Sequence, residues 1–361
     1  MRLFDFGVEI DLNLTKGVKT LKRTKNKKLK KIGKQTYIFE NEPRIFSSHS
    51  VVSQKEKDGP FSEYFYDVLS DTKFDEKTFE KAESKMFVYA LHNAIKKAGI
   101  KPNEIDILFS GDLLDQIISS SYCARLFDIP YMGIYGACST MAEGLIFSAI
   151  FIDGGFGEVA ACVTGSHYAS AERQFRGPLE LGAQKQKYSQ HTVTAAAAVI
   201  VGLVNQGIKI TKACVGKVED YGVTDSANMG AAMAPAAMST LVQFFIDTNT
   251  KADDYDLIVT GDLGKLGSDL LRVLMKEKGY HLGQNYMDCG ASIYHHDQYT
   301  SEGGSGCGCG AAVLEAFILP KMEQGQYKKV IFIATGALLS TIIVQQGESI
   351  PCIAHLVLLE K

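Results

Sequence analysis

The sequence predicts an α/β protein built from two copies of one strand–helix unit. Residues 106–113 (DILFSGDL) closely resemble residues 256–263 (DLIVTGDL), at a shift of 150 positions. Residues 153–165 align without gaps on residues 324–336, at a shift of 171 positions. A repeat of this kind predicts two matched halves that pack against each other.

The elements of the first half alternate between apolar strands and helices. Such an order predicts a mostly buried, mixed sheet with helices on both faces and ligand sites at the strand carboxyl ends. Carried back along the chain, the second shift places Cys138 opposite Cys309, each just before a helix rich in small residues. The expected elements are a strand at 33–39, a polar loop at 48–60, a helix at 77–99 and strands at 105–109, 131–135 and 158–163.

The charge distribution sets one end of the chain apart. Residues 16–34 hold ten Lys or Arg and no acid. Because the net charge of the whole chain is −3, the other residues together carry about −13. We expect a basic, disordered extension at 1–32, then an N-terminal half at 33–204 and a C-terminal half at 205–361. The stretch 16–34 also suits an anionic membrane surface, at about 1 kcal/mol per basic residue. The acidic body opposes nucleic acid, which we do not expect as a partner.

The composition is ordinary for a soluble globular protein, with 46% hydrophobic and 22% charged residues. No apolar run reaches the roughly 18–20 residues of a membrane span, and the N-terminus lacks the pattern of a signal peptide. Eight cysteines scattered through apolar segments indicate core use in a reducing compartment. Cys307 and Cys309 are too closely spaced for the usual zinc pair, so no metal site is expected.

Cys138 is the candidate nucleophile, because it follows an apolar strand and opens a helix. The unpaired N–H groups and the dipole at a helix N-terminus favour thiolate, so we expect a lowered thiol pKa. The same N–H groups would stabilise an oxyanion. The alternative is a small buried residue that fills space behind the strand.

A nucleophilic cysteine needs a base, usually histidine. His167 follows the strand at 158–163 and is the candidate that would face the same crevice, unless it is a hydrogen-bonded core residue. Arg173 and Arg176 suit bidentate binding of carboxylates. The alternative for the two arginines is a salt bridge with Glu172 or Glu180.

The glycine-rich run 303–311 brings backbone close to a neighbour. It lacks the Lys-Ser/Thr of a phosphate loop and does not fit the dinucleotide register, so no nucleotide cofactor is expected. Residues 228–235 (NMGAAMAP) predict a closely packed core helix.

Several unusual strings occur in an order that closely resembles the stage V sporulation protein AD family, thiolase-fold proteins of endospore-forming bacteria. The match runs from about Gly33 to Glu360, and the family usually begins near Gly33, so residues 1–32 depart from it. The strings are YGACST (135–140), SHY (166–168), AERQFR (171–176), NMGAAMAP (228–235), DYDLIVTGDLGK (254–265), GGSGCG (303–308) and QGESIP (346–351).

The resemblance implies a thiolase-like, five-layered αβαβα fold of two duplicated halves, often as a homodimer. It also implies binding of dipicolinic acid, pyridine-2,6-dicarboxylate, and support of its uptake into the developing spore with small membrane proteins of the same operon. The expected location is soluble and peripheral to the spore inner membrane.

Mapped onto this sequence, Cys138 falls at the thiolase nucleophile position. Condensing enzymes place a His, and then His or Asn, at turns that match 261–263 and 304–306, which hold neither here. This departure favours a pocket that binds dipicolinate and no longer condenses carbon chains. The alternatives are an acyltransferase or ketoacyl-synthase-like enzyme that uses Cys138, and a scaffold without a ligand. The expected ligand contacts are Cys138, His167, Arg173, Arg176, Asp262, Lys265 and Ser305.

Overall fold

The computed structural model describes residues 29–177, 179 and 186–361, and its main strands form two units with the same internal order. In the first unit the order is β3 (Arg44–Val52), β8 (Ala195–Gly202), β6 (Val159–Ser166), β4 (Ile107–Gly111) and β5 (Tyr131–Gly133). In the second it is β9 (Ile208–Cys214), β14 (Cys352–Glu360), β13 (Lys329–Ala337), β10 (Leu257–Thr260) and β11 (Tyr286–Asp288). Each unit mixes parallel and antiparallel pairs at equivalent places, which confirms the predicted duplication.

The two units join through their first strands. β3 and β9 pair antiparallel, with Ile45 opposite Ile208, so one continuous sheet runs through both halves. A hairpin of β1 (Lys31–Ile32) and β2 (Thr36–Ile38), which turns at Gly33 with φ +56°, adds to β9. The strand expected at 33–39 is therefore shorter and the end of the expected extension is structured, whereas residues 1–28 lie outside the described part.

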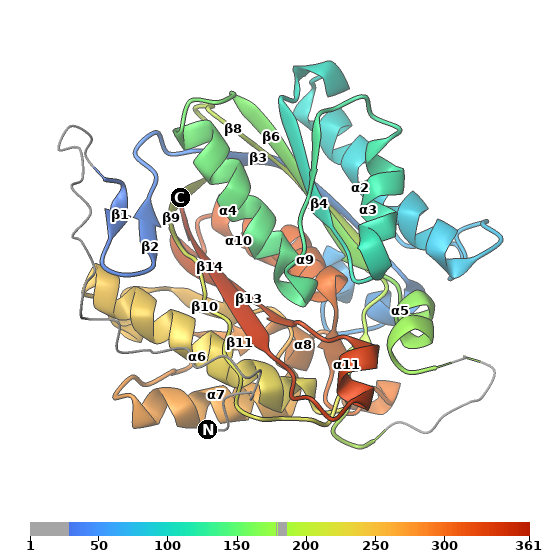
Figure 1. Cartoon of the computed structure of the whole chain (residues 1–361). Helices are drawn as coiled ribbons and strands as arrows, with labels where there is room; N and C mark the ends of the chain where they lie inside the picture. Colours follow the sequence, from blue (N-terminus) through green and yellow to red (C-terminus); the bar gives the residue numbers. More distant parts are fainter. Residues whose placement is uncertain (1–28, 178, 180–185) are drawn as a thin grey trace, which may run out of the picture.

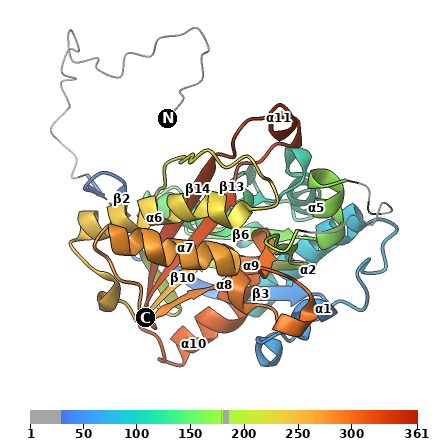
Figure 2. The ribbon, with the colours of Figure 1, turned by 90° about the horizontal axis from the view of Figure 1, so that it is seen from below.

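Helices form three layers around these strands (Figures 1 and 2). α2 (Phe79–Ala98) packs on the outer face of the first unit, with α3 (Ile118–Ala124) beside it, and α6 (Met229–Thr248) and α7 (Gly264–Glu277) cover the second. α4 (Thr140–Asp153) and α9 (Cys307–Val313) lie between the units. A π-helical stretch, Leu314–Ile318, joins α9 to α10 (Leu319–Glu323). The predicted five-layer arrangement is confirmed. The shorter elements are α1 (Gln54–Lys57), α5 (Tyr168–Phe175), β7 (His191–Thr192), α8 (Cys289–Ser292), β12 (Gly304–Ser305) and α11 (Thr341–Gln345).

The outer helices α2 and α6 are equivalent in the repeat, and they match in length and in the way they are capped. Each has 20 residues, and their starts are 150 positions apart, the shift seen in the sequence. The Thr78 hydroxyl caps α2 by accepting from the Lys81 N–H, and Gly99 ends the helix in the left-handed conformation, as predicted. Asn228 caps α6 in the same way, and Asn249 ends it with φ 54°.

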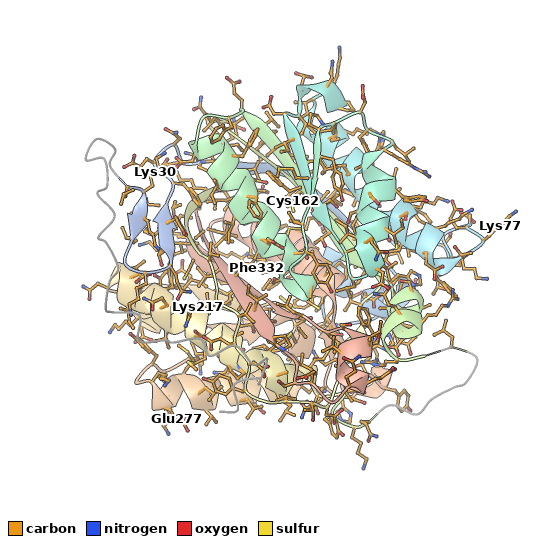
Figure 3. All side chains as sticks on the ribbon, in the orientation of Figure 1. Lys30, Lys77, Cys162, Lys217, Glu277 and Phe332 are labelled. Atoms are coloured by element: carbon orange, nitrogen blue, oxygen red, sulfur yellow. The ribbon has the colours of Figure 1, made fainter. Side chains whose placement is uncertain are left out.

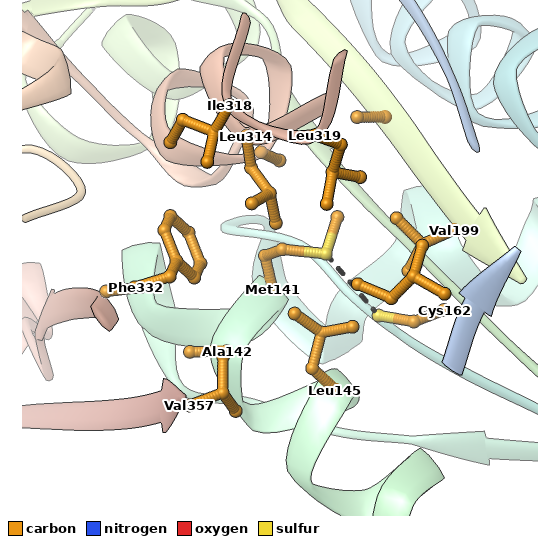
Figure 4. Close-up of a cluster of buried hydrophobic side chains, with 14 of the residues drawn as sticks. Met141, Ala142, Leu145, Cys162, Val199, Leu314, Ile318, Leu319, Phe332 and Val357 are labelled. Carbon is orange, nitrogen blue, oxygen red and sulfur yellow. Dashed lines mark hydrogen bonds between the residues drawn. The ribbon is translucent and has the colours of Figure 1, made fainter. Parts of the chain in front are cut away.

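The core between the units is built on α4. Figure 4 shows Met141 and Leu145 of α4 among side chains from both units, including Phe332 and Val357. The Met141 and Cys162 sulfur atoms lie 4.0 Å apart. Burying each such large apolar side chain contributes about 1.5–3 kcal/mol. In Figure 3 the labelled Lys30, Lys77 and Glu277 lie near the outline of the molecule, whereas Cys162 and Phe332 lie within it and are buried.

The loop expected at 48–60 is wrong at its start, because residues 48–52 end β3. Serines at these positions obscured the strand pattern in the sequence. Here the Ser48 and Ser50 hydroxyls donate to the two oxygens of the Glu315 carboxylate, at 3.1 and 2.7 Å. A partner from the π-helical stretch thus satisfies polar groups on a strand at the junction of the two units.

Among the described residues, one helix is long and apolar enough to cross a membrane, namely α6. Of its apolar window, 67% is buried inside the molecule. α6 is therefore a core helix, as residues 228–235 predicted.

Candidate functional site

A pocket that opens to solvent lies where turns from both halves meet α5, and the space in it and in its mouth is about 570 Å³. Its lining is mostly apolar, and includes Leu113, Tyr135, Ala137, Ala171, Phe175, Met229, Ala337 and Leu339. The remaining lining residues are Cys138, Glu172, Arg176, Thr192, Ser226, Ser305 and Gly306. Such a pocket suits a flat apolar ring that carries a few polar groups.

Cys138 lies in a single helical turn, Ala137–Ser139, between β5 and α4. Its partly exposed side chain lines the pocket. Burial raises the pKa of the thiol well above its usual value, and the nearby Asp262 carboxyl raises it further. The predicted lowering of this pKa is therefore wrong, because desolvation and a neighbouring carboxylate outweigh the helix N-terminus.

Asp262 follows β10 and is buried beside Cys138. Its Oδ1 accepts a hydrogen bond from the Thr335 hydroxyl and its Oδ2 one from the Gly306 N–H, each at 2.9 Å. Burial raises the pKa of Asp262 to about 7, although its hydrogen bond with the Cys138 thiol lowers it. This carboxyl therefore changes its charge near neutral pH.

Only one of the two predicted arginines reaches the pocket. Arg176 lines it, and its guanidinium donates to the Glu172 carboxylate and, at 3.3 Å, to the Gln190 carbonyl. The salt bridge with Glu172 that the sequence left open is confirmed. Arg173 is not among the lining residues. Its guanidinium donates to Glu80 on α2 at 2.9 Å, and its side chain is 44% exposed.

His167 does not line the pocket. It caps α5, because Nδ1 accepts from the Ala169 N–H at 3.1 Å, while Nε2 lies 2.6 Å from the Thr72 carbonyl. The ring is buried, and burial lowers its pKa, so the neutral form is favoured. The structure therefore supports the hydrogen-bonded core residue and contradicts the predicted base.

Lys265 also falls outside the set of lining residues, since its amino group donates to the Ser301 carbonyl at 3.2 Å. Ser305, in contrast, lines the pocket from β12, where it pairs with Thr192 of β7. Gly306 next to it has φ +99°, and a Cβ there would lie 2.6 Å from the Ser166 hydroxyl. Glycine is required at this position, and it brings its N–H to Asp262.

Cys309 takes no part in the pocket. The repeat predicted that Cys309 lies just before a helix, but it is the third residue of α9. Its side chain has no exposed area, and its thiol donates to the Gly261 carbonyl at 3.4 Å. Among the described residues, no group of three or more His, Cys, Asp or Glu could hold a metal ion.

Gln190 and Thr335 are site residues that sequence reasoning missed. The Gln190 side-chain amide donates to the carbonyls of Asp262 and Gly304, each at 2.7 Å, and so joins two turns of the pocket wall. Nothing in its local sequence predicts this. Thr335 is equivalent to Thr164 at the shift of 171 residues, and this equivalence was the signal in the sequence that could have identified it.

The layered fold is thiolase-like. One similar solved structure is a variant of OleA from Xanthomonas campestris in which a histidine is replaced by aspartate, with a TM-score of 0.58 and 14% identity, covering 90% of this chain and 99% of that one. Another is 3-oxoacyl-[acyl-carrier-protein] synthase III from Aquifex aeolicus, with a TM-score of 0.55 and 12% identity, covering 88% of this chain and all of that one. At these identities the likeness shows the fold alone.

The particular family follows from sequence. The model of the stage V sporulation protein AD family matches residues 33–360, and the chain belongs to this family. The stage V sporulation protein AD of Bacillus subtilis (strain 168) is 43% identical over 333 residues, which are 92% of this chain and 98% of that protein.

Proposed function

We propose that the pocket binds dipicolinate without covalent chemistry, and that the chain supports dipicolinate uptake into the developing spore with small membrane proteins as partners. The observation that carries this proposal is the buried Asp262 carboxyl beside Cys138. A base would have to take a proton from this thiol, but Asp262 favours the protonated form. The retained cysteine is therefore a poor nucleophile in a well-formed pocket.

The lining supports a planar, anionic ligand. Arg176 offers a forked donor to one carboxylate, and its place is fixed by Glu172 and Gln190. Phe175, Met229 and the other apolar residues would contact the ring. The hydroxyls of Thr192 and Ser305 supply further donors.

The proposal is tested by calorimetric titration with dipicolinate and with isophthalate, which keeps both carboxylates and lacks the ring nitrogen. We expect saturable binding of dipicolinate at one site per chain, and weaker binding of isophthalate. No saturable heat with dipicolinate would refute the proposal. Incubation with acyl-CoA followed by intact-mass measurement tests the enzymatic alternative, which an acyl adduct on Cys138 would support.

We also propose that two copies of the chain associate through the outer edge of β5 and α4. β5 ends the strand order, and no described strand pairs with its outer edge. Met132 on β5 is 55% exposed, and Phe147 and Ile150 on α4 are each 40% exposed. Sedimentation should show a dimer that Phe147→Glu dissociates and Ile246→Glu, on the exposed face of α6, does not. A parent protein that sediments as a monomer would refute the dimer.

A further inference from the structure

The charges that line the pocket do not match a ligand with two carboxylates. Among the described residues that line the pocket, Arg176 is the only cation, and it is paired with Glu172, which also lines the pocket. The two side chains together contribute about zero net charge. Dipicolinate is doubly negative near neutral pH, so its second carboxylate would enter an apolar pocket without a cation, and charge burial of this kind is costly.

The groups around Asp262 do not supply that cation. The carboxyl of Asp288, at the end of β11, acts on Asp262 through its charge and is itself an acid. The other titratable groups that interact with Asp262 are thiols, and burial raises the pKa of each, so all are neutral near pH 7. These thiols are Cys138 before α4, Cys307 and Cys309 of α9, Cys289 of α8 and Cys352 of β14.

We infer that dipicolinate binding, the function proposed above, takes up about one proton from solvent, and that Asp262 holds this proton. Asp262 is not itself among the lining residues, but two of its three hydrogen-bond partners, Cys138 and Gly306, line the pocket, and the third, Thr335, lies behind it. The proton binds to the carboxylate oxygen, and no covalent bond of the ligand forms or breaks.

The expected pH dependence follows from the sign of the effect. Burial already raises the pKa of Asp262 to about 7, and a ligand carboxylate nearby raises it further. The ligand therefore binds better to the form with protonated Asp262. Affinity is full below about pH 7 and falls as the pH rises above it, by at most about tenfold per pH unit.

Proton uptake is measured by titrating the whole protein with dipicolinate at pH 7.5 in two buffers of different ionisation enthalpy, phosphate and Tris. We expect between about 0.5 and 0.8 proton taken up per ligand bound, because free Asp262, with a pKa of about 7, is already about one-quarter protonated at this pH. Saturable binding with no proton uptake would overturn this inference and leave the proposed binding function intact. A protein that binds no dipicolinate in either buffer would refute both.

Three variants assign the proton to its group. Asp262→Asn should abolish the uptake and make the affinity independent of pH between about 7 and 8.5. Asp253→Asn, which removes a surface carboxyl of the same half, should keep the parent's uptake. Thr335→Val removes a donor to Asp262, which raises its pKa, so uptake at pH 7.5 should fall. Uptake that persists in folded Asp262→Asn would refute the assignment.

Discussion

The two central helices occupy equivalent places in the two halves, but their surroundings differ. All residues of α9 are buried, whereas α4 exposes Phe147 and Ile150. The cause is the length of the preceding connection. β5 leads almost directly into α4, whereas β11 and α9 are separated by a longer segment whose α8 and β12 pack against α9. The longer connection before α9 therefore covers Cys309, whereas Cys138, which has no such segment before α4, stays partly exposed.

The turns after β4 and β10 show the same divergence. Asp112 and Asp262 are equivalent at the 150-residue shift, and both are buried. Asp112 accepts from the Leu114 N–H at 2.9 Å and from the Ser120 hydroxyl at 2.7 Å, so it fixes its own loop. Asp262 accepts from Gly306 and Thr335 and touches Cys138, so it joins both halves. The duplication sets the scaffold, and partners from other segments set the chemistry.

The largest expected effect separates the two faces of α4. Leu145→Ala should lower the free energy of unfolding by about 2–5 kcal/mol, because Leu145 is fully buried between the units. Phe147→Ala, on the partly exposed face of the same helix, should cost less, about 1–2 kcal/mol, because Phe147 is 40% exposed and stacks on Phe109. Urea denaturation, at protein concentrations low enough to dissociate the proposed dimer, measures both values. Equal costs would contradict the placement of α4.

The second-largest expected effect is a difference in dipicolinate affinity between substitutions of Arg176 and of Arg173. Arg176→Ala should weaken dipicolinate binding by about ten- to a hundredfold, because it removes a charge-assisted contact of about 1.5–3 kcal/mol. Arg173→Ala is the matched control and should bind like the parent, since Arg173 pairs with Glu80 away from the pocket. The opposite order in calorimetric titrations would show that the pocket is misassigned.

The two equivalent cysteines should differ in alkylation. Iodoacetamide should label Cys138 slowly at pH 7.5, because its thiol pKa is raised, and Cys309 more slowly still, because it is inaccessible. Asp262→Asn should speed labelling of Cys138 by about tenfold if it lowers that pKa by one unit. Peptide mass spectrometry gives both rates. Faster labelling of Cys309 in folded protein would invert the roles.

The smallest effect on folding is expected at the N-terminus. A protein that begins at Leu29 keeps the ion pair of Lys30 with Asp153, at 2.7 Å, and the β1–β2 hairpin. It should not melt at a lower temperature for want of residues 16–28, because this basic stretch has no apolar face to bury. It should lose salt-sensitive binding to anionic liposomes. Equal liposome binding by both proteins would remove the proposed membrane attachment.

The duplication and the layers could be predicted because each strand and helix carries its own periodicity, and the repeat pairs distant segments. Asp262, Ser305 and Cys138 could also be brought together from sequence, because strand carboxyl ends meet at one edge. The positions of His167 and Arg173 could not. His167 caps the start of α5, Arg173 lies within this helix, and Arg176 caps its end. Only the direction of each side chain decides whether it faces the pocket or α2. The pKa of Cys138 likewise depends on burial and on a carboxyl 124 positions away.

The most direct test of the central claim is a crystal structure of the protein grown with dipicolinate. We expect one ligand per chain in the pocket, with a carboxylate within about 3 Å of the Arg176 guanidinium and no covalent bond to Cys138. A ligand bound elsewhere, for example at Arg173, or one joined covalently to Cys138, would contradict the claim.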